Sequence, residues 1–296
     1  MTSGEGDNQA AVDALLALLA LESLGDGRFL GQSPPVGPQR IYGGQVASQA
    51  LVAAGRTVDP GRSVHSLHAY FVRPGDPAEP LTFQVESIRD GRSFSVRRSV
   101  AFQHDKPIFL MSASFHIPEA GLDHQAPAPH DVPPPEELPT LAERLSKYPD
   151  RAGWLTATPF PMDVRYVDEP GWVPPGDRPP QPNQRVWLRI AGKLPDDPVL
   201  HACALTFLSD MTLLDSVLAA HGEVWGPGGL IGASLDHALW FHRPFRADEW
   251  LLYDCWSPSA SDARGLAMGR LFTRHGRHVA SAVQEGLLRR VGGGPR

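Results

Sequence analysis

Asp210 is the residue whose surroundings most strongly suggest chemistry. It lies in an otherwise apolar run, residues 202–214, which is interrupted only by hydroxyl side chains. A carboxylate there must be solvated, paired or hydrogen-bonded, because burying it bare is costly. Two interpretations stay open: Asp210 caps the N-terminus of a helix over 211–220, or it acts in catalysis. They are compatible, because a helix N-terminus also stabilises negative charge in a transition state.

Ser234 and Gln284 are two further polar residues at expected strand positions. The strand expected over 278–288 alternates, so Gln284 shares a face with Ala280 and Ala282, opposite the valines of the same segment. Taken alone, that position suits a solvent-facing glutamine, and a lone serine at the start of a strand is usually structural. Neither residue by itself indicates a function.

Several known catalytic motifs are absent from the sequence. It contains no Gly-x-Ser-x-Gly nucleophile elbow, which argues against a serine thioesterase of the α/β-hydrolase type. It also has no Gly-x-x-x-x-Gly-Lys phosphate loop and no Gly-x-Gly-x-x-Gly dinucleotide turn. The histidines lack metal-ligand spacing, and we interpret His237 and His242, on opposite sides of an expected strand, as solvent or core residues. We therefore expect neither a metal nor a cofactor.

A weak internal repeat organises the elements that would position these residues. Arg73-Pro74 ends one strand-like run, and Arg243-Pro244 ends another 170 residues later. The same offset aligns the following turn and the last strand of each half. A helix is expected before each run, over 45–54 and over 211–220, each with a glycine nearby to end it. This agreement in near register indicates a duplication.

Each half is expected to be one apolar helix followed by antiparallel strands, because Gly, Pro and Asp turns separate the strands at hairpin-like distances. The expected strands cover 64–72, 81–88, 94–103 and 108–115 in the first half, and 234–241, 250–257, 264–273 and 278–288 in the second. An antiparallel sheet wrapped around a central helix is an α+β fold. Prolines make residues 118–160 a linker, so we expect domains over 1–117 and 161–292.

The composition is that of a soluble globular protein: 296 residues, of which 42% are hydrophobic and 20% charged. With a formal net charge of −6 and no basic run, the chain is a poor candidate for nucleic-acid or anionic-membrane binding. The apolar stretch 10–24 is too short to span a bilayer and is expected to form a short docking helix. Only Cys203 and Cys255 are present, and no signal peptide is evident, so we expect the cytoplasm.

Six longer segments occur in the order in which one enzyme family carries them. They are YGGQV at 42–46, YFVRPGD at 70–76, RDGRSF at 89–94, SD at 209–210, LDHALWFHRPF at 235–245 and ASAVQEG at 280–286. On these segments the chain resembles the acyl-CoA thioesterase II family, from residue 15 to residue 289. The resemblance implies two fused hotdog domains, hydrolysis of fatty acyl-CoA to free fatty acid and CoA, and a homo-oligomer, either dimer or tetramer.

The resemblance also implies an active site. The family holds its hydrolytic water with an Asp, a Thr or Ser, and a Gln, and these positions fall on Asp210, Ser234 and Gln284. Asp210 would then act as the general base, while the other two would orient the water by hydrogen bonds. Backbone N–H groups at a helix start can bind the thioester oxygen as it becomes an oxyanion, and Gly43 and Gly44 are the candidates for this role.

The repeat predicts a single site in each chain. At the 170-residue offset, Gln284 corresponds to Ser114 and Ser234 to Val64, and aligning the helix ends places a glycine opposite the acid. The first half would therefore act as a partner sheet and substrate wall.

Two rival functions remain open at this point. A hotdog enoyl-CoA hydratase would need an acid/base pair over the acyl chain, typically with a His, and no His accompanies the Asp210 set in sequence. A non-catalytic acyl-CoA-binding protein would have no need of a water-activating carboxylate.

Overall fold

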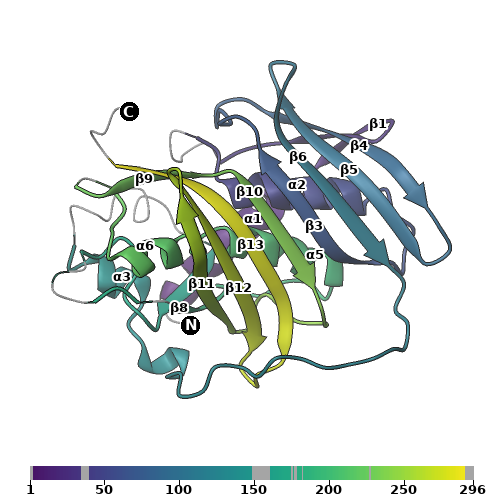
Figure 1. The fold of residues 1–296 in the computed structure, drawn as a ribbon. Helices are drawn as coiled ribbons and strands as arrows, with labels where there is room; N and C mark the ends of the chain where they lie inside the picture. Colours follow the sequence, from purple (N-terminus) through teal and green to yellow (C-terminus); the bar gives the residue numbers. More distant parts are fainter. Residues whose placement is uncertain are drawn as a thin grey trace.

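The computed structural model describes residues 3–34, 40–148, 161–174, 176, 179–181, 183–226 and 228–290. Within these ranges the strands form one 13-stranded sheet, with helices α2 (Gly43–Gly55) and α5 (Pro198–Ser209) packed side by side against it (Figure 1). The paired strands are antiparallel, so the predicted α+β class is confirmed. Among the described helices, none is both long and apolar enough to cross a membrane.

The first half matches the predicted elements closely. Its helix α2 and its four main strands begin and end within two residues of the predicted bounds. The N-terminal helix α1 is also present, with Leu15 and Leu19 buried. The hairpin of β1 and β2 was not predicted, because strands of four residues show too little alternation. The elements are α1 (Ser3–Leu19), β1 (Glu22–Gly25), β2 (Arg28–Gly31), α2, β3 (Ser63–Phe71), β4 (Leu81–Asp90), β5 (Phe94–Gln103) and β6 (Lys106–His116).

The described part of the Pro-rich segment between the halves contains two short helices, η1 (Pro135–Glu137) and α3 (Leu141–Leu145). Thr140 begins α3 with a capping box, in which Glu143 is the reciprocal partner. The Trp187 ring nitrogen donates to the Pro133 carbonyl at 2.9 Å. This segment therefore packs over side chains of the second half without adding a strand from its described residues.

The second half contains more strands than predicted. Its elements are β7 (Met162–Tyr166), β8 (Asn183–Ile190), α5, α6 (Asp215–His221), β9 (Leu230–Ser234), β10 (Asp236–Phe241), β11 (Leu251–Ser261), β12 (Arg264–Thr273) and β13 (His278–Arg290). The predicted strand over 234–241 is two strands, so Ser234 ends β9 and does not begin the later strand. The Asp236 carboxylate explains the break, because it accepts the Glu285 N–H at 2.7 Å in place of a backbone carbonyl.

The predicted helix over 211–220 is wrong in its start. Residues 210–214 form a turn between α5 and α6. The true start signal lies earlier: the Asp197 side chain caps α5 and Pro198 occupies its first turn. Asp210 is therefore the C-cap residue of α5 and not the N-cap of the following helix.

The two halves join edge to edge in the middle of the sheet. Strand β3 pairs with β10, so that His68 lies opposite Ala238. One cluster of buried apolar side chains includes residues from both halves. Behind the sheet α2 and α5 run antiparallel, because Gly44 approaches Phe207 while Gly55 approaches Val199. The start of one central helix thus lies beside the end of the other.

Candidate active site

Asp210, Ser234 and Gln284 lie together in the structure. The Gln284 amide Nε2 donates to Asp210 Oδ1 at 2.5 Å, and the Ser234 hydroxyl donates to the same oxygen at 3.2 Å. Gln284 is fully buried, whereas Asp210 and Ser234 each keep part of their surface exposed. The three residues singled out from the sequence therefore form one hydrogen-bonded cluster with access to solvent.

Three elements of the second half position this cluster. Asp210 lies where the central helix is interrupted between α5 and α6. Ser234 ends β9, opposite Gly286 of β13. Gln284 lies on the inner face of β13, opposite Ala267 of β12. Gln284 does not face solvent, as a glutamine at such a strand position usually would, because this face of the sheet packs against the helices.

The first half contributes the start of α2. A Cβ placed on Gly43 would lie 2.7 Å from Asp210 Oδ2, so a glycine here lets the carboxylate approach the backbone. Tyr42, the N-cap residue, makes no side-chain bond to the helix start, whereas the Gly44 N–H donates to Asp210. Asp210 thus takes the place of a capping side chain, at the positive end of the α2 dipole.

The pKa of Asp210 is raised from 3.8 to about 6. Burial is the largest cause, because it penalises the charged form of the carboxyl group. Hydrogen bonds from Gln284, Ser234 and the Gly44 N–H act in the opposite direction. The carboxylate is therefore ionised at neutral pH, yet it remains basic enough to accept a proton.

The Gln284 side chain has an unused acceptor. Its amide nitrogen is directed to Asp210, and its Oε1 atom is buried without a hydrogen bond from the protein atoms that the structure describes. A buried acceptor without a partner is costly. The cluster can therefore bind a ligand that donates a hydrogen to Oε1.

Two tyrosine side chains hold the end of α5 in place, and neither was predicted from the sequence. The Tyr42 hydroxyl donates to the Phe207 carbonyl at 2.8 Å, and the Tyr253 hydroxyl donates to the Ser209 carbonyl at 3.2 Å. These carbonyls lack partners within the helix, because they belong to its last turn. Tyr42 stands beside Gly43 in a segment that carries the family resemblance, whereas no sequence signal indicates Tyr253.

His237 is also linked to the site: it lies in a segment that carries the family resemblance, but no role at the site was predicted for it. It is fully buried, and its Nε2 lies 2.8 Å from the Ser209 hydroxyl. That hydroxyl donates to the Thr206 carbonyl, so the ring Nε2–H is the donor to Ser209. Burial lowers the pKa of His237 to about 4, and the ring is therefore neutral. The prediction that His237 is a solvent or core residue therefore holds, and the structure places it in the core. It lies beside Ser209, the residue that precedes Asp210.

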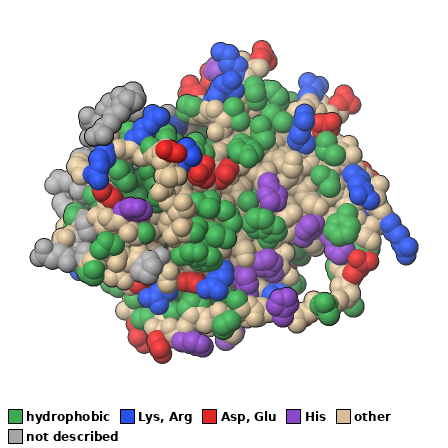
Figure 2. Space-filling view, viewed as in Figure 1, with side chains coloured by type: hydrophobic (Ala, Val, Ile, Leu, Met, Phe, Trp, Pro, Cys, Tyr) green, Lys and Arg blue, Asp and Glu red, His purple; other side chains and the backbone are tan. Residues whose placement is uncertain are grey.

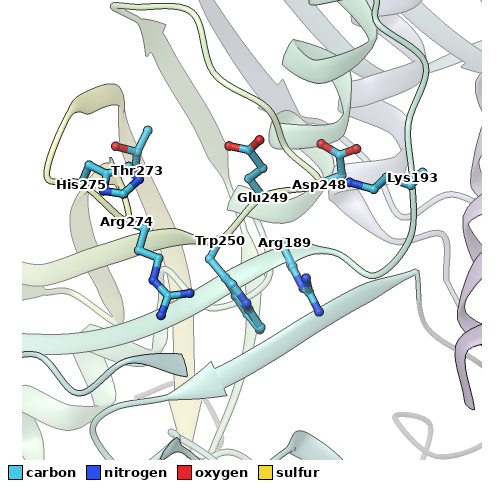
Figure 3. Close-up of a pocket in the computed structure, with 8 residues that line it drawn as sticks. All are labelled: Arg189, Lys193, Asp248, Glu249, Trp250, Thr273, Arg274 and His275. Atoms are coloured by element: carbon cyan, nitrogen blue, oxygen red, sulfur yellow. The ribbon is translucent and has the colours of Figure 1, made fainter. Parts of the chain in front are cut away.

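A separate hollow of about 270 Å³ lies at the far end of the second-half strands (Figure 3). Arg189 and Trp250 point the same way in it, with the guanidinium carbon 4.4 Å from the centre of the ring. Thr273, one of its lining residues, lies six residues along β12 from Ala267, which pairs with Gln284. Six strand residues span roughly 20 Å. This hollow is therefore distinct from the Asp210 cluster.

The corresponding place in the first half is filled by an arginine. At the 170-residue offset, Arg97 of β5 corresponds to Ala267, the neighbour of Gln284. Its buried guanidinium donates to the carbonyl and hydroxyl oxygens of Thr57, just beyond the end of α2, and to Asp90. The first half therefore has a cation with satisfied hydrogen bonds where the second half has its carboxylate and amide.

Comparisons with known proteins agree with the resemblance seen in the sequence. The family model "Acyl-CoA thioesterase" matches residues 157–287, and "Acyl-CoA thioesterase N-terminal domain" matches residues 31–116. Human acyl-coenzyme A thioesterase 8 is 40% identical over 92% of this chain and 88% of its own length.

Solved structures confirm the predicted double-hotdog fold. An acyl-CoA thioesterase II from Mycobacterium marinum is 43% identical, with a TM-score of 0.76, over 95% of this chain and 100% of its own. A hot dog fold protein of unknown function from Alicyclobacillus acidocaldarius has a TM-score of 0.76 at 18% identity, over 94% and 98% of the two chains. The second likeness shows the fold alone.

Proposed function

The chain belongs to the acyl-CoA thioesterase II family, and we propose that Asp210 activates the water that hydrolyses the thioester, with Ser234 and Gln284 as its partners. The proposal rests on one observation: the Gln284 amide and the Ser234 hydroxyl converge on a single oxygen of Asp210. A carboxylate held in this way keeps a defined orientation. Its pKa of about 6 suits a general base at neutral pH.

The reaction balances in two steps. A water molecule donates one hydrogen to Asp210 and the other to Gln284 Oε1, and attacks the thioester carbonyl carbon as its proton passes to the carboxylate. The tetrahedral intermediate then expels the CoA sulfur, which takes that proton from Asp210. The products are a carboxylic acid and CoA, and the carboxylate is regenerated.

The oxyanion donor in this proposal is the Gly43 N–H. The sequence suggested Gly43 and Gly44 together, but the Gly44 N–H already donates to Asp210. The first bond within α2 runs from the Gln45 N–H to the Tyr42 carbonyl, so the Gly43 N–H has no partner inside the helix. Its place beside Asp210 suits a donor to the developing oxyanion.

We propose fatty acyl-CoA as the substrate, with fatty acid and CoA as products, because the relatives that align over nearly the whole chain are acyl-CoA thioesterases. A hydratase is less well supported. Such an enzyme typically uses a histidine as an acid or base. His237, the histidine linked to this cluster, is fully buried and bonded to Ser209, and burial lowers its pKa to about 4.

The test is the Asp210→Asn variant in a thiol-release assay with acyl-CoA. We expect kcat/KM to fall by about 10²-fold to 10⁴-fold, the usual contribution of a general base. Asp215→Asn is a matched control, because the pKa of Asp215 is likewise raised to about 6, but its carboxylate accepts from Trp225 and not from Gln284 or Ser234. Unchanged activity in Asp210→Asn would remove the proposed mechanism.

The proposal also includes a homo-oligomer, dimer or tetramer, in the cytoplasm. Figure 2 shows hydrophobic side chains gathered on the face of the molecule over the sheet. Two exposed apolar side chains, Tyr70 and Leu110, are paired across β3 and β6, and Tyr70 is 58% exposed. Exposed apolar groups on a sheet face are typical of protein contacts. Light scattering after size-exclusion chromatography tests the oligomer, and cell fractionation tests the compartment.

A further inference from the structure

Two glycines face each other on the inner side of the sheet, next to the catalytic residues. Gly286 of β13 pairs with Gly265 of β12, two residues beyond the pair formed by Gln284 and Ala267. Residues two apart on a strand share a face, so the glycine pair lies roughly 7 Å from Gln284 on the same surface. The sheet has no side chains at this place.

Leu214 and Val217 cover this bare surface. A Cβ on Gly286 would lie 2.5 Å from the Leu214 side chain, and one on Gly265 would lie 2.5 Å from Val217. Leu214 belongs to the turn that begins at Asp210, and Val217 belongs to the seven-residue helix α6. The cover over the glycines is thus built on a turn and a short helix, directly after the proposed base.

Beyond the glycine pair the structure has a pocket of about 200 Å³. Val217 and Leu288 line it, and Leu288 also lies 2.8 Å from the place of a Cβ on Gly265. Leu288 is four residues along β13 from Gln284, a distance of roughly 13 Å. The glycine pair therefore lies between the catalytic residues and the pocket. Val217 borders the glycine pair and also lines the pocket.

The charges around the pocket favour an apolar occupant over the phosphates of CoA. Its arginines are already paired: Arg264 with Glu285 at 3.2 Å, and Arg290 with Glu223. The C-terminal end of α6 also reaches the pocket with His221, and that end of a helix dipole is negative. The apolar part of its lining consists of Val217, Leu230, Ala260, Ala263 and Leu288.

We infer that the acyl chain of the substrate runs from the catalytic residues across Gly286 and Gly265 toward this pocket, and that Leu214 and Val217 limit its length. This inference rests on the proposed function, since it takes Asp210 and Gln284 as the position of the thioester. Chain atoms can lie directly on the bare strands. A short acyl group ends before Leu214, whereas a longer one must displace Leu214 and then Val217.

The test compares kcat/KM for palmitoyl-CoA and butyryl-CoA within each variant, so that a loss of folded protein cancels from the ratio. Leu214→Ala and Val217→Ala are expected to raise the palmitoyl-to-butyryl ratio by about tenfold or more, because they remove methyl and methylene groups that compete with the chain. Gly286→Ala fills the path and is expected to lower the ratio.

Leu51→Ala is the matched control, because Leu51 is a fully buried leucine in α2 of the first half. It is expected to lose stability and keep the wild-type ratio. Ratios that stay unchanged in both Leu214→Ala and Val217→Ala would overturn the inference. Asp210→Asn separates this failure from failure of the proposed function, since that variant tests the chemistry at every chain length. If Leu214→Ala does not fold, Leu214→Phe replaces it and is expected to lower the palmitoyl-to-butyryl ratio. A wild-type ratio in Leu214→Phe would also overturn the inference.

Discussion

The Asp210 carboxyl group is subject to two opposing influences. Burial raises its pKa, while the Gln284 amide, the Ser234 hydroxyl and the Gly44 N–H lower it, and the balance lies at about 6. If burial acted alone, the pKa of Asp210 would be higher and less of the group would be ionised at neutral pH. If the hydrogen-bond donors acted alone, its pKa would be lower and the carboxylate would be a weaker base. Each donor is therefore expected to influence the pH at which the proposed base becomes active.

We predict that kcat/KM rises with pH through about 6 and then levels off, because Asp210 accepts a proton only as a carboxylate. Below that pH the carboxyl is increasingly protonated, and the rate should fall by about tenfold for each pH unit. Thiol-release rates at low acyl-CoA concentration, measured between about pH 5 and pH 8, check this. A profile that stays flat through pH 6 would contradict it.

Ser234→Ala is predicted to move the midpoint of that profile upward by about one pH unit. The hydroxyl lowers the pKa of Asp210, and a hydrogen bond to a charged group contributes about 1.5 kcal/mol or more. Ser234→Thr retains the donor and should keep the midpoint near that of the wild type. A midpoint that moves down, or equally in both variants, would show that the hydroxyl acts in another way.

At the scale of elements, the site depends on how two central helices meet. The break at 210–214 places Asp210 outside regular helix, where its side chain can turn toward a neighbouring element. The antiparallel packing of α2 against α5 then brings the uncapped start of α2 to that carboxylate. A helix with its own capping side chain would compete with Asp210 for the same N–H groups.

Gly43→Ala is predicted to reduce kcat/KM by about tenfold to a hundredfold and to destabilise the fold by about 1–3 kcal/mol. The added Cβ would lie 2.7 Å from both Asp210 Oδ2 and the Phe71 ring, so one of them must move. Kinetics and thermal denaturation measure the two effects. Gly121→Ala is the control, since nothing lies within 4 Å of its Cβ position, and wild-type behaviour in Gly43→Ala would refute the close approach.

At the scale of the whole molecule, the two halves have different roles in one site. The first half supplies the start of α2, and the second half supplies Asp210, Ser234 and Gln284. The pairing of β3 with β10 holds these parts in one sheet. We keep the division into domains over 1–117 and 161–292, with a linker over 118–160, as a proposal about folding units.

We predict that one non-hydrolysable acyl-CoA thioether binds to each chain in isothermal titration calorimetry. The equivalent place in the first half holds Arg97, whose guanidinium donates to Thr57 and Asp90. Two equal sites for each chain would contradict this asymmetry. The Asp210→Asn variant should retain a stoichiometry of one, because it removes the proposed base and not the proposed acyl path.

The sequence by itself determined the local elements and the candidate residues. Turn residues and alternation predicted the main strands, and the segment resemblance selected Asp210, Ser234 and Gln284 from ordinary polar residues. The sequence pattern placed Asp210 at the start of a helix in the second half, which is wrong. The residues that begin the true helix α5, the cap Asp197 and Pro198, lie twelve residues or more upstream of Asp210.

Only the tertiary structure decided which partners surround Asp210. Gln284 lies 74 residues away in sequence, and the start of α2 belongs to the other half. Their approach depends on strand register and on the crossing of two helices, which are set by packing over the whole sheet and not by local propensity. The glycine pair opposite Leu214 and Val217 has the same origin, since two unremarkable glycines form one surface only when β12 and β13 pair.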